Sequence, residues 1–270
     1  WSSDVCSSDL SIQSSLNNSH IKLYQVGGCV RDELLGVKSK DIDYSVVIDC
    51  TGSEQIDVIT GLDLLESYLV SNAYTIFLKT PDTFTFRAKN NKTGEIADFV
   101  LARHEIGYDQ TSRKPHVVLG TLAQDLARRD FTINAMARDE FGNLIDLFNG
   151  QTDLTNRILK TPLDPTDTFL DDPLRLFRAL RFCITKQLKF DPSLWSGFLN
   201  PLVYNKLWKV VSAERIREEL HKMFSFDSEK SLRLLVEFSG KISQVSPTFL
   251  SDCFEKTGLW LKPTNEKVKK

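Results

Sequence analysis

Residues 27–48 of the chain read GGCVRDELLGVKSKDIDYSVVI, and this stretch decides which fold we expect. The apolar run before it, 21–26, predicts a strand that ends in the turn formed by Gly27 and Gly28. The run 30–35 predicts a helix that opens directly from this turn. Because glycine has no side chain, backbone N–H groups at such a turn can approach an anion such as phosphate closely. A plain loop is the alternative.

Two carboxylates follow, Asp41 and Asp43, at the start of a β-branched run, 42–48, that predicts a second strand. Residues i and i+2 of a strand face the same side, so the strand would present both carboxylates together. Two like charges repel unless a cation lies between them, and oxygen ligands suit Mg²⁺. A two-metal phosphoryl-transfer site usually needs a third carboxylate. Asp98, in the strand-like run 96–102, is the candidate, with a solvent-facing edge residue as the alternative.

Two groups of arginines could bind phosphate in such a site. Arg31, directly after the glycine turn, adds a planar fork of donors suited to a triphosphate. A second basic cluster reads LARRDFTINAMA at 126–137 and contains Arg128 and Arg129. We expect Asp130 to pair with one of these two arginines while the other reaches phosphate. The alternative is a pair of arginines that only solvates a helix boundary.

A third cluster reads DDPLRLFRALRF at 171–182, with an arginine at every third position: Arg175, Arg178 and Arg181. Asp172 before Pro173 predicts an N-cap followed by proline at the first helical position. The arginines would form a winding stripe beside the apolar face of the helix. Asp172 and Arg175 could offer an acceptor and a fork of donors to the edge of a nucleotide base. A capped helix with a solvated basic face is the alternative.

The expected strands and helices divide the chain into a mixed α/β part and a helical part. Further strands are expected at 74–78, 83–88, 96–102 and 144–148, and helices at 56–72, 122–129, 132–138, 173–182, 212–224 and 229–238. Residues 11–148 are therefore expected to be mixed α/β, and 149–270 largely α-helical. The expected fold class is α+β, a mixed β-sheet followed by an all-α region.

Composition restricts the class of protein. Of 270 residues, 41% are apolar and 26% are charged, which is typical of a folded chain. No window reaches 18 apolar residues, so we expect no membrane span. The chain has 34 basic and 36 acidic residues, so a polyanion would be met by local basic patches. The basic residues are enriched in 183–270, which fits an acidic, metal-binding front part joined to an anion-binding back part.

The cysteines of the chain are isolated from one another, which argues against a zinc cluster or a disulfide framework. This usage predicts that the protein works in a reducing cytoplasm.

The first ten residues, WSSDVCSSDL, show neither an apolar period nor the pattern of a signal peptide. The run DVCSSDL resembles the translation of a sequencing-adapter oligonucleotide. We therefore expect residues 1–10 to be a non-native scar. A native, disordered N-terminus is the alternative.

Four motifs occur in one order: GGCVRDELLG…DIDY, LARRDFTINAMA, DDPLRLFRALRF and SAERIREELHK. Together they resemble the class II tRNA nucleotidyltransferase and bacterial poly(A) polymerase family, over roughly residues 21–225. The resemblance implies a nucleotidyltransferase head of the polymerase β type at 11–148. It also implies a helical neck that binds the nucleotide base and RNA at 149–228, and a short helical remnant of a body domain at 229–270.

The resemblance also implies roles for residues. The catalytic carboxylates would be Asp41, Asp43 and Asp98, of which Asp41 and Asp43 bind Mg²⁺. The triphosphate would be held by Gly28, Arg31 and Arg129. The base would face Asp172 and Arg175, supported by Arg178 and Arg181. The implied reaction is attack of an RNA 3′-hydroxyl on the α-phosphorus of ATP or CTP, with pyrophosphate leaving.

Several functions remain open within this resemblance. Addition or repair of the 3′-terminal CCA of tRNA is the leading hypothesis. Template-independent poly(A) synthesis is the nearest rival, but the chain has no GRRFRL-like strand, which favours the tRNA enzyme. An enzyme that adds only C or only A is a further alternative. Outside this class, a non-catalytic RNA-binding module would not need the D-x-D pair, and a small-molecule nucleotidyltransferase should lack the arginine helix.

Two departures from the family pattern bear on these alternatives. The usual Glu-Asp before the arginine helix is Asp171-Asp172 here, so the support of the base-reading pair is altered. About 45 residues follow the helix expected at 212–224, which carries the SAERIREELHK motif, whereas fuller members continue with domains that grip tRNA. A short chain could bind a smaller substrate, grip RNA with its basic neck or act as a homodimer.

Overall fold

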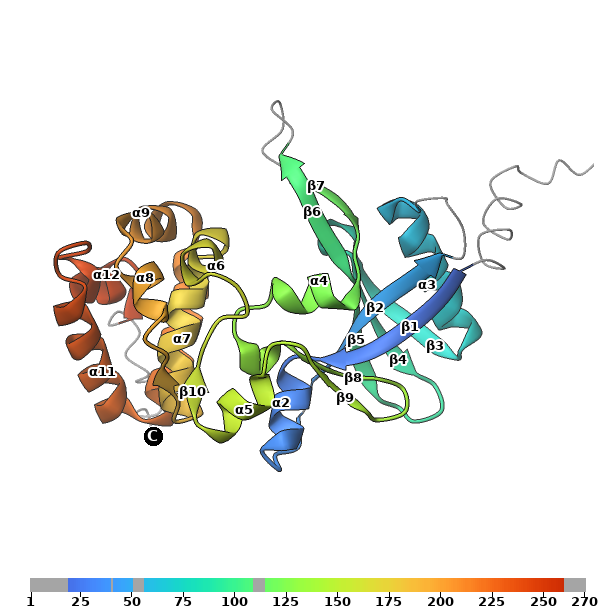
Figure 1. Ribbon diagram of the computed structural model, residues 1–270, viewed down its shortest axis with the longest axis horizontal. Coiled ribbons are helices and arrows are strands. Elements are labelled where there is room, and N and C mark those ends of the chain that lie inside the picture. Colours follow the sequence, from blue (N-terminus) through green and yellow to red (C-terminus); the bar gives the residue numbers. More distant parts are fainter. Residues whose placement is uncertain (1–18, 40, 51–55, 109–114, 260–270) are drawn as a thin grey trace, which may run out of the picture. The chain divides into compact units, whose positions relative to one another are not determined.

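The computed structural model describes residues 19–39, 41–50, 56–108 and 115–259 (Figure 1). The predicted non-native segment 1–10 lies outside these residues. The chain divides into two compact units. The sheet unit takes in the described residues of Trp1–Arg129 together with Ile133–Gln151. The helical unit comprises Asp130–Thr132 and the described residues of Thr152–Lys270. The predicted α+β fold class is confirmed.

A seven-stranded mixed sheet forms the sheet unit, in the order β3-β4-β5-β2-β1-β8-β9. The strands are β1 (Ser19–Val26), β2 (Ile42–Cys50), β3 (Tyr74–Thr80), β4 (Thr85–Asn90), β5 (Ile96–Leu101), β8 (Met136–Arg138) and β9 (Leu144–Asp146). β2 and β5 run parallel, and the other neighbours are antiparallel. The parallel pair at the centre of the sheet sets the two strands that carry the predicted carboxylates side by side.

Helix α3 (Val58–Ser71) packs on one face of this sheet (Figure 1). Its first turn is capped by Asp57, whose carboxylate accepts a hydrogen bond from the Thr60 N–H at 2.8 Å. The leucines of its inner face are buried against apolar strand residues in a cluster that contains Val46, Leu65, Leu69, Phe86 and Phe99. This core holds the central strands β2 and β5 in place.

The helix predicted over 132–138 is wrong. Thr132–Asn134 form a single 3₁₀ turn, and β8 follows as a strand that pairs Ala137 with Val26 of β1. Ala135 and Ala137 are fully buried with Val26, so sheet pairing and burial override the local helix propensity of the segment. A hairpin of β6 (Arg103–Tyr108) and β7 (Pro115–Leu119) was also not predicted.

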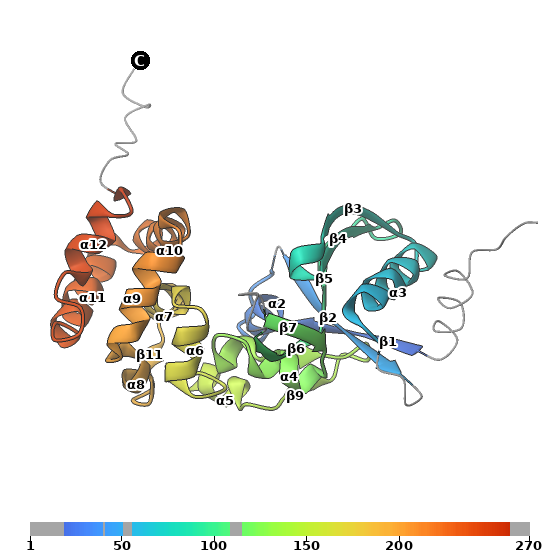
Figure 2. The ribbon, with the colours of Figure 1, turned by 90° about the horizontal axis from the view of Figure 1, so that it is seen from above.

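The later part of the chain is mainly helical. Its helices are α5 (Gly150–Thr155), α6 (Pro165–Asp171), α7 (Leu174–Thr185), α8 (Leu194–Phe198), α9 (Pro201–Val210), α10 (Ala213–Phe226), α11 (Ser228–Lys241) and α12 (Phe249–Glu255). Two short strands, β10 (Ile158–Leu159) and β11 (Lys189–Phe190), pair in parallel. Helix α7 packs against α10 and α11 (Figure 2). None of the described helices is long and apolar enough to cross a bilayer.

The start of α7 differs from the prediction by one residue. Pro173 is its N-cap, and Asp172 ends the preceding helix α6 in an extended conformation. The two helices meet at this point, so Asp172 lies one position before the cap. Its carboxylate still accepts a hydrogen bond from the first helical N–H, that of Leu174, at 3.1 Å.

Close packing of α8 on α6 depends on Gly197. A Cβ at this position would lie 2.9 Å from the backbone oxygen of Pro165 and would collide with the ring of Phe169. We expect Gly197→Ala to lower the free energy of unfolding by about 1–3 kcal/mol, because backbone cannot give way as a side-chain end can. Urea unfolding measures the change.

The matched control is Gly240→Ala in α11, where a Cβ would meet nothing within 4 Å. Alanine there should stabilise the chain by about 0.4–1 kcal/mol, because it restricts the unfolded state. Equal effects of the two substitutions would contradict the packing of α8 on α6.

Candidate functional site

The acidic residues gather where the central strands lie side by side. The parallel register of β2 and β5 pairs Asp43 directly with Asp98, and the next pair, Tyr44 and Phe99, stack their rings at 5.0 Å. Asp43 is half-buried, and the Asp98 side chain is 30% exposed. Asp41 precedes β2 and is largely exposed. Two of the three predicted carboxylates are therefore cross-strand neighbours on one face of the sheet.

This arrangement is electrostatically strained. Burial raises the pKa of the Asp43 carboxyl, and the nearby charges of Asp98 and Asp41 raise it further, whereas Arg129 and Arg87 act in the opposite direction. A carboxylate surrounded by like charges is stabilised by a cation. The oxygen donors present at this point fit a hard divalent ion by their chemistry. Within the described ranges, no three His, Cys, Asp or Glu side chains already form a metal cage.

Arg87 supplies positive charge at the acidic residues, and sequence reasoning missed it. It lies on β4 directly opposite Asp98 in the antiparallel register. Its Nε is 3.5 Å from Asp98 Oδ1, and its Nη2 is 3.9 Å from Asp41 Oδ1. The only sequence signal was an arginine in the neighbouring predicted strand, and the register that brings it to Asp98 is not visible in the sequence.

The glycine turn brings the basic and acidic residues together. Gly27 has a φ of 79°, in the region that favours glycine. A Cβ on Gly27 would lie 2.9 Å from Nη1 of Arg129 and 4.0 Å from Oδ2 of Asp43. The guanidinium of Arg129 and the carboxylate of Asp43 thus both lie against the same backbone position. The prediction had singled out Gly28, and the structure adds Gly27.

Arg31 lies beneath the turn. It is 7% exposed, and its Nη2 is 3.5 Å from the position of a Cβ on Gly28. Its Nη1 donates to Asn134 at 2.6 Å and its Nε to Asp32 at 2.9 Å. In this arrangement Arg31 braces the turn from within the protein, and its predicted contact with a triphosphate stays a prediction.

The adjacent arginines share a buried acceptor that the sequence did not indicate. Asp125 accepts from both of them, from Arg129 Nη2 at 2.9 Å and from Arg128 Nη2, and Asp130 accepts from Arg178. Asp125 lies on α4 (Leu122–Ala127), one turn before the arginines, whereas Asp130 has left that helix. Burial alone would raise the pKa of Asp125, but Arg129 and Arg128 together hold it below its usual range.

The arginine stripe of α7 is engaged by acidic residues. Arg178 donates to Asp130 from Nε at 2.8 Å and from Nη2 at 2.5 Å, and Arg181 pairs with Glu219 of α10. The side chains of Arg175, Arg178 and Arg181 are 14%, 33% and 14% exposed. The alternative of a solvated basic face is therefore wrong.

The predicted base-reading pair has separate partners in this structure. Arg175 lies 3.2 Å from the carboxylate of Asp171 and donates to the Thr168 carbonyl. Asp172 lies 3.5 Å from Arg215 of α10. The two side chains occupy consecutive positions at the start of the stripe, and their joint action on a base stays a prediction.

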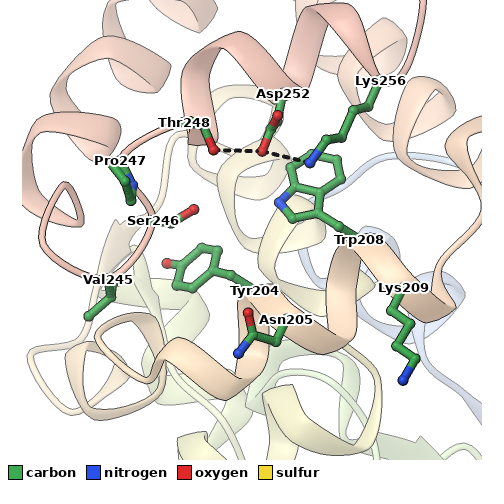
Figure 3. Close-up of a pocket in the computed structure, with 10 residues that line it drawn as sticks. All are labelled: Tyr204, Asn205, Trp208, Lys209, Val245, Ser246, Pro247, Thr248, Asp252 and Lys256. Carbon is green, nitrogen blue, oxygen red and sulfur yellow. Dashed lines mark hydrogen bonds and ion pairs between the residues drawn. The ribbon is translucent and has the colours of Figure 1, made fainter.

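The helical unit also contains a pocket of about 580 Å³ between α9 and α12 (Figure 3). Trp208 and Asp252 line it, and the Nζ of Lys256 lies 3.0 Å from Asp252 and 4.9 Å from the centre of the Trp208 ring. None of the predicted site residues lines this pocket. The predicted residues instead form two groups, one around the glycine turn of the sheet unit and one along α7.

Comparison with known proteins assigns the family. The family profile of the poly A polymerase head domain matches residues 23–160, which is about half of the chain. The chain belongs to this family, and the resemblance read from its motifs is confirmed.

Individual relatives agree with this assignment. The chain is 33% identical to the tRNA nucleotidyltransferase cca2 of Schizosaccharomyces pombe, over 82% of this chain and 47% of the relative. It is 32% identical to a CCA-adding enzyme of Lactobacillus helveticus, over 95% and 62%. Among solved structures, the Thermotoga maritima CCA-adding enzyme complexed with tRNA matches with a TM-score of 0.62 and 26% identity, over 90% of this chain and 53% of that one. The chain thus spans about half to three fifths of the length of these proteins.

A substitution at Gly27 tests the close approach of Arg129. We expect Gly27→Ala to lower the free energy of unfolding by more than Gly94→Ala does. Both glycines have a positive φ, but Gly27 combines it with a ψ of −130°, a conformation outside the left-handed helical region that other residues can adopt, and only Gly27 has neighbours within 4 Å of the new Cβ. In an Arg129→Ala background the difference between the two substitutions should become smaller, as judged by urea unfolding, because only the backbone cost at Gly27 remains. An unchanged difference in that background would show that Arg129 does not lie over Gly27.

Proposed function

We propose that this chain is the catalytic part of a tRNA nucleotidyltransferase that adds or repairs the 3′-terminal CCA from CTP and ATP. The observation that carries the proposal is the meeting of Arg129 and Asp43 at Gly27, with Asp98 paired beside Asp43. A phosphate-binding turn and a pair of carboxylates are the two parts that phosphoryl transfer requires. The relatives named as CCA-adding enzymes, one of them in complex with CTP, support this choice of reaction.

The proposal assigns roles within the sheet unit. Asp41 and Asp43 would hold Mg²⁺, with Asp98 as the third carboxylate. Bound Mg²⁺ would lower the pKa of the attacking 3′-hydroxyl and neutralise charge on the departing pyrophosphate. Arg129 and the backbone of Gly27 and Gly28 would hold the triphosphate, and Arg31 would keep the turn in shape through Asn134.

Roles in the helical unit complete the proposal. Asp172 and Arg175 would present an acceptor and donors to C or A, the pattern that distinguishes these bases from G and U. Arg178 and Arg181 would support them, because each is fixed by a buried acid, Asp130 and Glu219 respectively.

We further propose that residues 11–148 act as the catalytic head, 149–228 as the neck and 229–270 as a remnant of a body. Cys29, Cys183 and Cys253 are free thiols, which supports action in the reducing cytoplasm.

Nucleotide incorporation tests the reaction directly. We expect the chain to extend a tRNA lacking its last three nucleotides by two residues with CTP alone, and by three with CTP and ATP together. Labelled nucleotides and gel electrophoresis measure the additions. Long A tracts with ATP alone would assign poly(A) synthesis instead, and addition of only C or only A would assign a partial activity. If CTP is never incorporated, CCA addition is excluded.

Removal of the two carboxylates of the D-x-D motif tests the metal assignment. We expect Asp41→Ala combined with Asp43→Ala to lower nucleotide transfer at least about a hundredfold, because charge developing on the triphosphate is no longer neutralised. RNA binding, measured by gel shift, should stay unchanged.

The matched control is Asp49→Asn at the far end of the same strand. Asp49 is half-exposed and pairs with Lys22 at 2.5 Å, so its loss should leave transfer unchanged. Transfer that survives in the double variant would remove Asp41 and Asp43 from the mechanism.

A further inference from the structure

We propose that Asp125 is a positioning residue that holds Arg129 in the orientation needed to grip the triphosphate of the incoming nucleotide. The inference rests on the proposed function, since it assigns a residue to the same reaction. Asp125 lies outside the D-x-D pair and directly before the LARRDFTINAMA motif at 126–137.

Asp125 is built into α4 as a clamp with two acceptors. It is 1% exposed, and its two oxygens are used separately, Oδ2 by Arg129 and Oδ1 by Arg128. The start of α4 is itself fixed, because Thr121 and Gln124 form a reciprocal capping box at its N-terminus. The charge of Asp125 therefore acts from a rigid, buried position.

The clamp determines which side of the Arg129 guanidinium faces the glycine turn. Nη2 is held by Asp125, and Nη1 lies 2.9 Å from the position that a Cβ of Gly27 would take. Nη1 is therefore the donor that an anionic oxygen at the turn would meet.

By restricting the rotamers of Arg129, Asp125 lowers the entropy that is lost when a polyphosphate binds. A free arginine side chain samples many rotamers, and part of that entropy is lost when it grips a ligand. Because Asp125 has already ordered Arg129, less of that entropy is lost when a polyphosphate binds. Electrostatics alone acts in the opposite direction, since a nearby carboxylate repels an anion. The two effects of Asp125 thus have opposite signs and can be separated by experiment.

Binding of inorganic tripolyphosphate in the presence of Mg²⁺, measured by calorimetry, is the test. We expect Asp125→Asn to weaken this binding about tenfold, the scale of one well-aligned hydrogen bond to a charged group. Loss of a negative charge by itself would strengthen the binding of an anion. Unchanged or tighter binding by Asp125→Asn would overturn the proposal.

A double-mutant cycle ties the effect to Arg129. We expect Asp125→Asn to have no further effect in an Arg129→Gln background, whereas full additivity would show that Asp125 acts elsewhere. The matched control is Asp252→Asn, which removes another buried, ion-paired acid, 7% exposed and bonded to Lys256 at 3.0 Å. It should leave tripolyphosphate binding unchanged.

Two further measurements keep the result decisive. Asp125→Asn alone leaves both Arg128 and Arg129 without their carboxylate, and this variant could fail to fold. In that case the double variant Asp125→Asn with Arg128→Gln is compared with Arg128→Gln alone, because only Arg129 then loses its carboxylate. The same tenfold loss is expected, and equal affinity would overturn the proposal. In CTP incorporation, Asp125→Asn should raise KM about tenfold and change kcat less. A wild-type chain that binds tripolyphosphate but transfers no nucleotide would refute the proposed function and leave the positioning role of Asp125 intact.

Discussion

The absence of a side chain at Gly27 is the constraint on which the rest of the site depends. At a φ of 79° and with no Cβ, this residue lets the Arg129 guanidinium and the Asp43 carboxylate lie against one turn of backbone. Any larger residue would push Arg129 away and strain the chain. The surrounding contacts serve this arrangement: Arg31 braces the turn from beneath, the β2–β5 register sets Asp98 beside Asp43, and Asp125 orients Arg129.

A second feature is the position of the RRD sequence in the chain. Arg129 and Asp130 are neighbours, yet Arg129 is fixed within the sheet unit by Asp125, and Asp130 is fixed within the helical unit by Arg178. One peptide bond thus joins a residue of the candidate triphosphate site to an anchor of the arginine helix. The carboxylate of each pair is buried, so removing its arginine would leave a buried ion without its partner and be destabilising.

Local patterns predicted most of the fold. Six of the seven strands of the central sheet and the helices α3, α7, α10 and α11 were placed to within a few residues, because apolar periodicity and capping residues report them directly, whereas α9 was not predicted. The 132–138 segment was misassigned because its burial against Val26 is a long-range effect. The same limit applies to the site. Asp43 and Asp98 were identified, but the cross-strand position of Arg87 depends on register, and the role of Asp125 depends on a helix end that the sequence does not show.

We propose that Gly27, Arg129 and the Asp43 carboxylate form one site for the triphosphate of a nucleotide. A crystal structure of the chain with CTP and Mg²⁺ tests it most directly. We expect a phosphate oxygen within hydrogen-bonding distance of Arg129 and of the backbone N–H groups of the Gly27-Gly28 turn, with the metal ion bound to Asp43. A triphosphate bound away from that turn, with Arg129 contacting only Asp125, would contradict it.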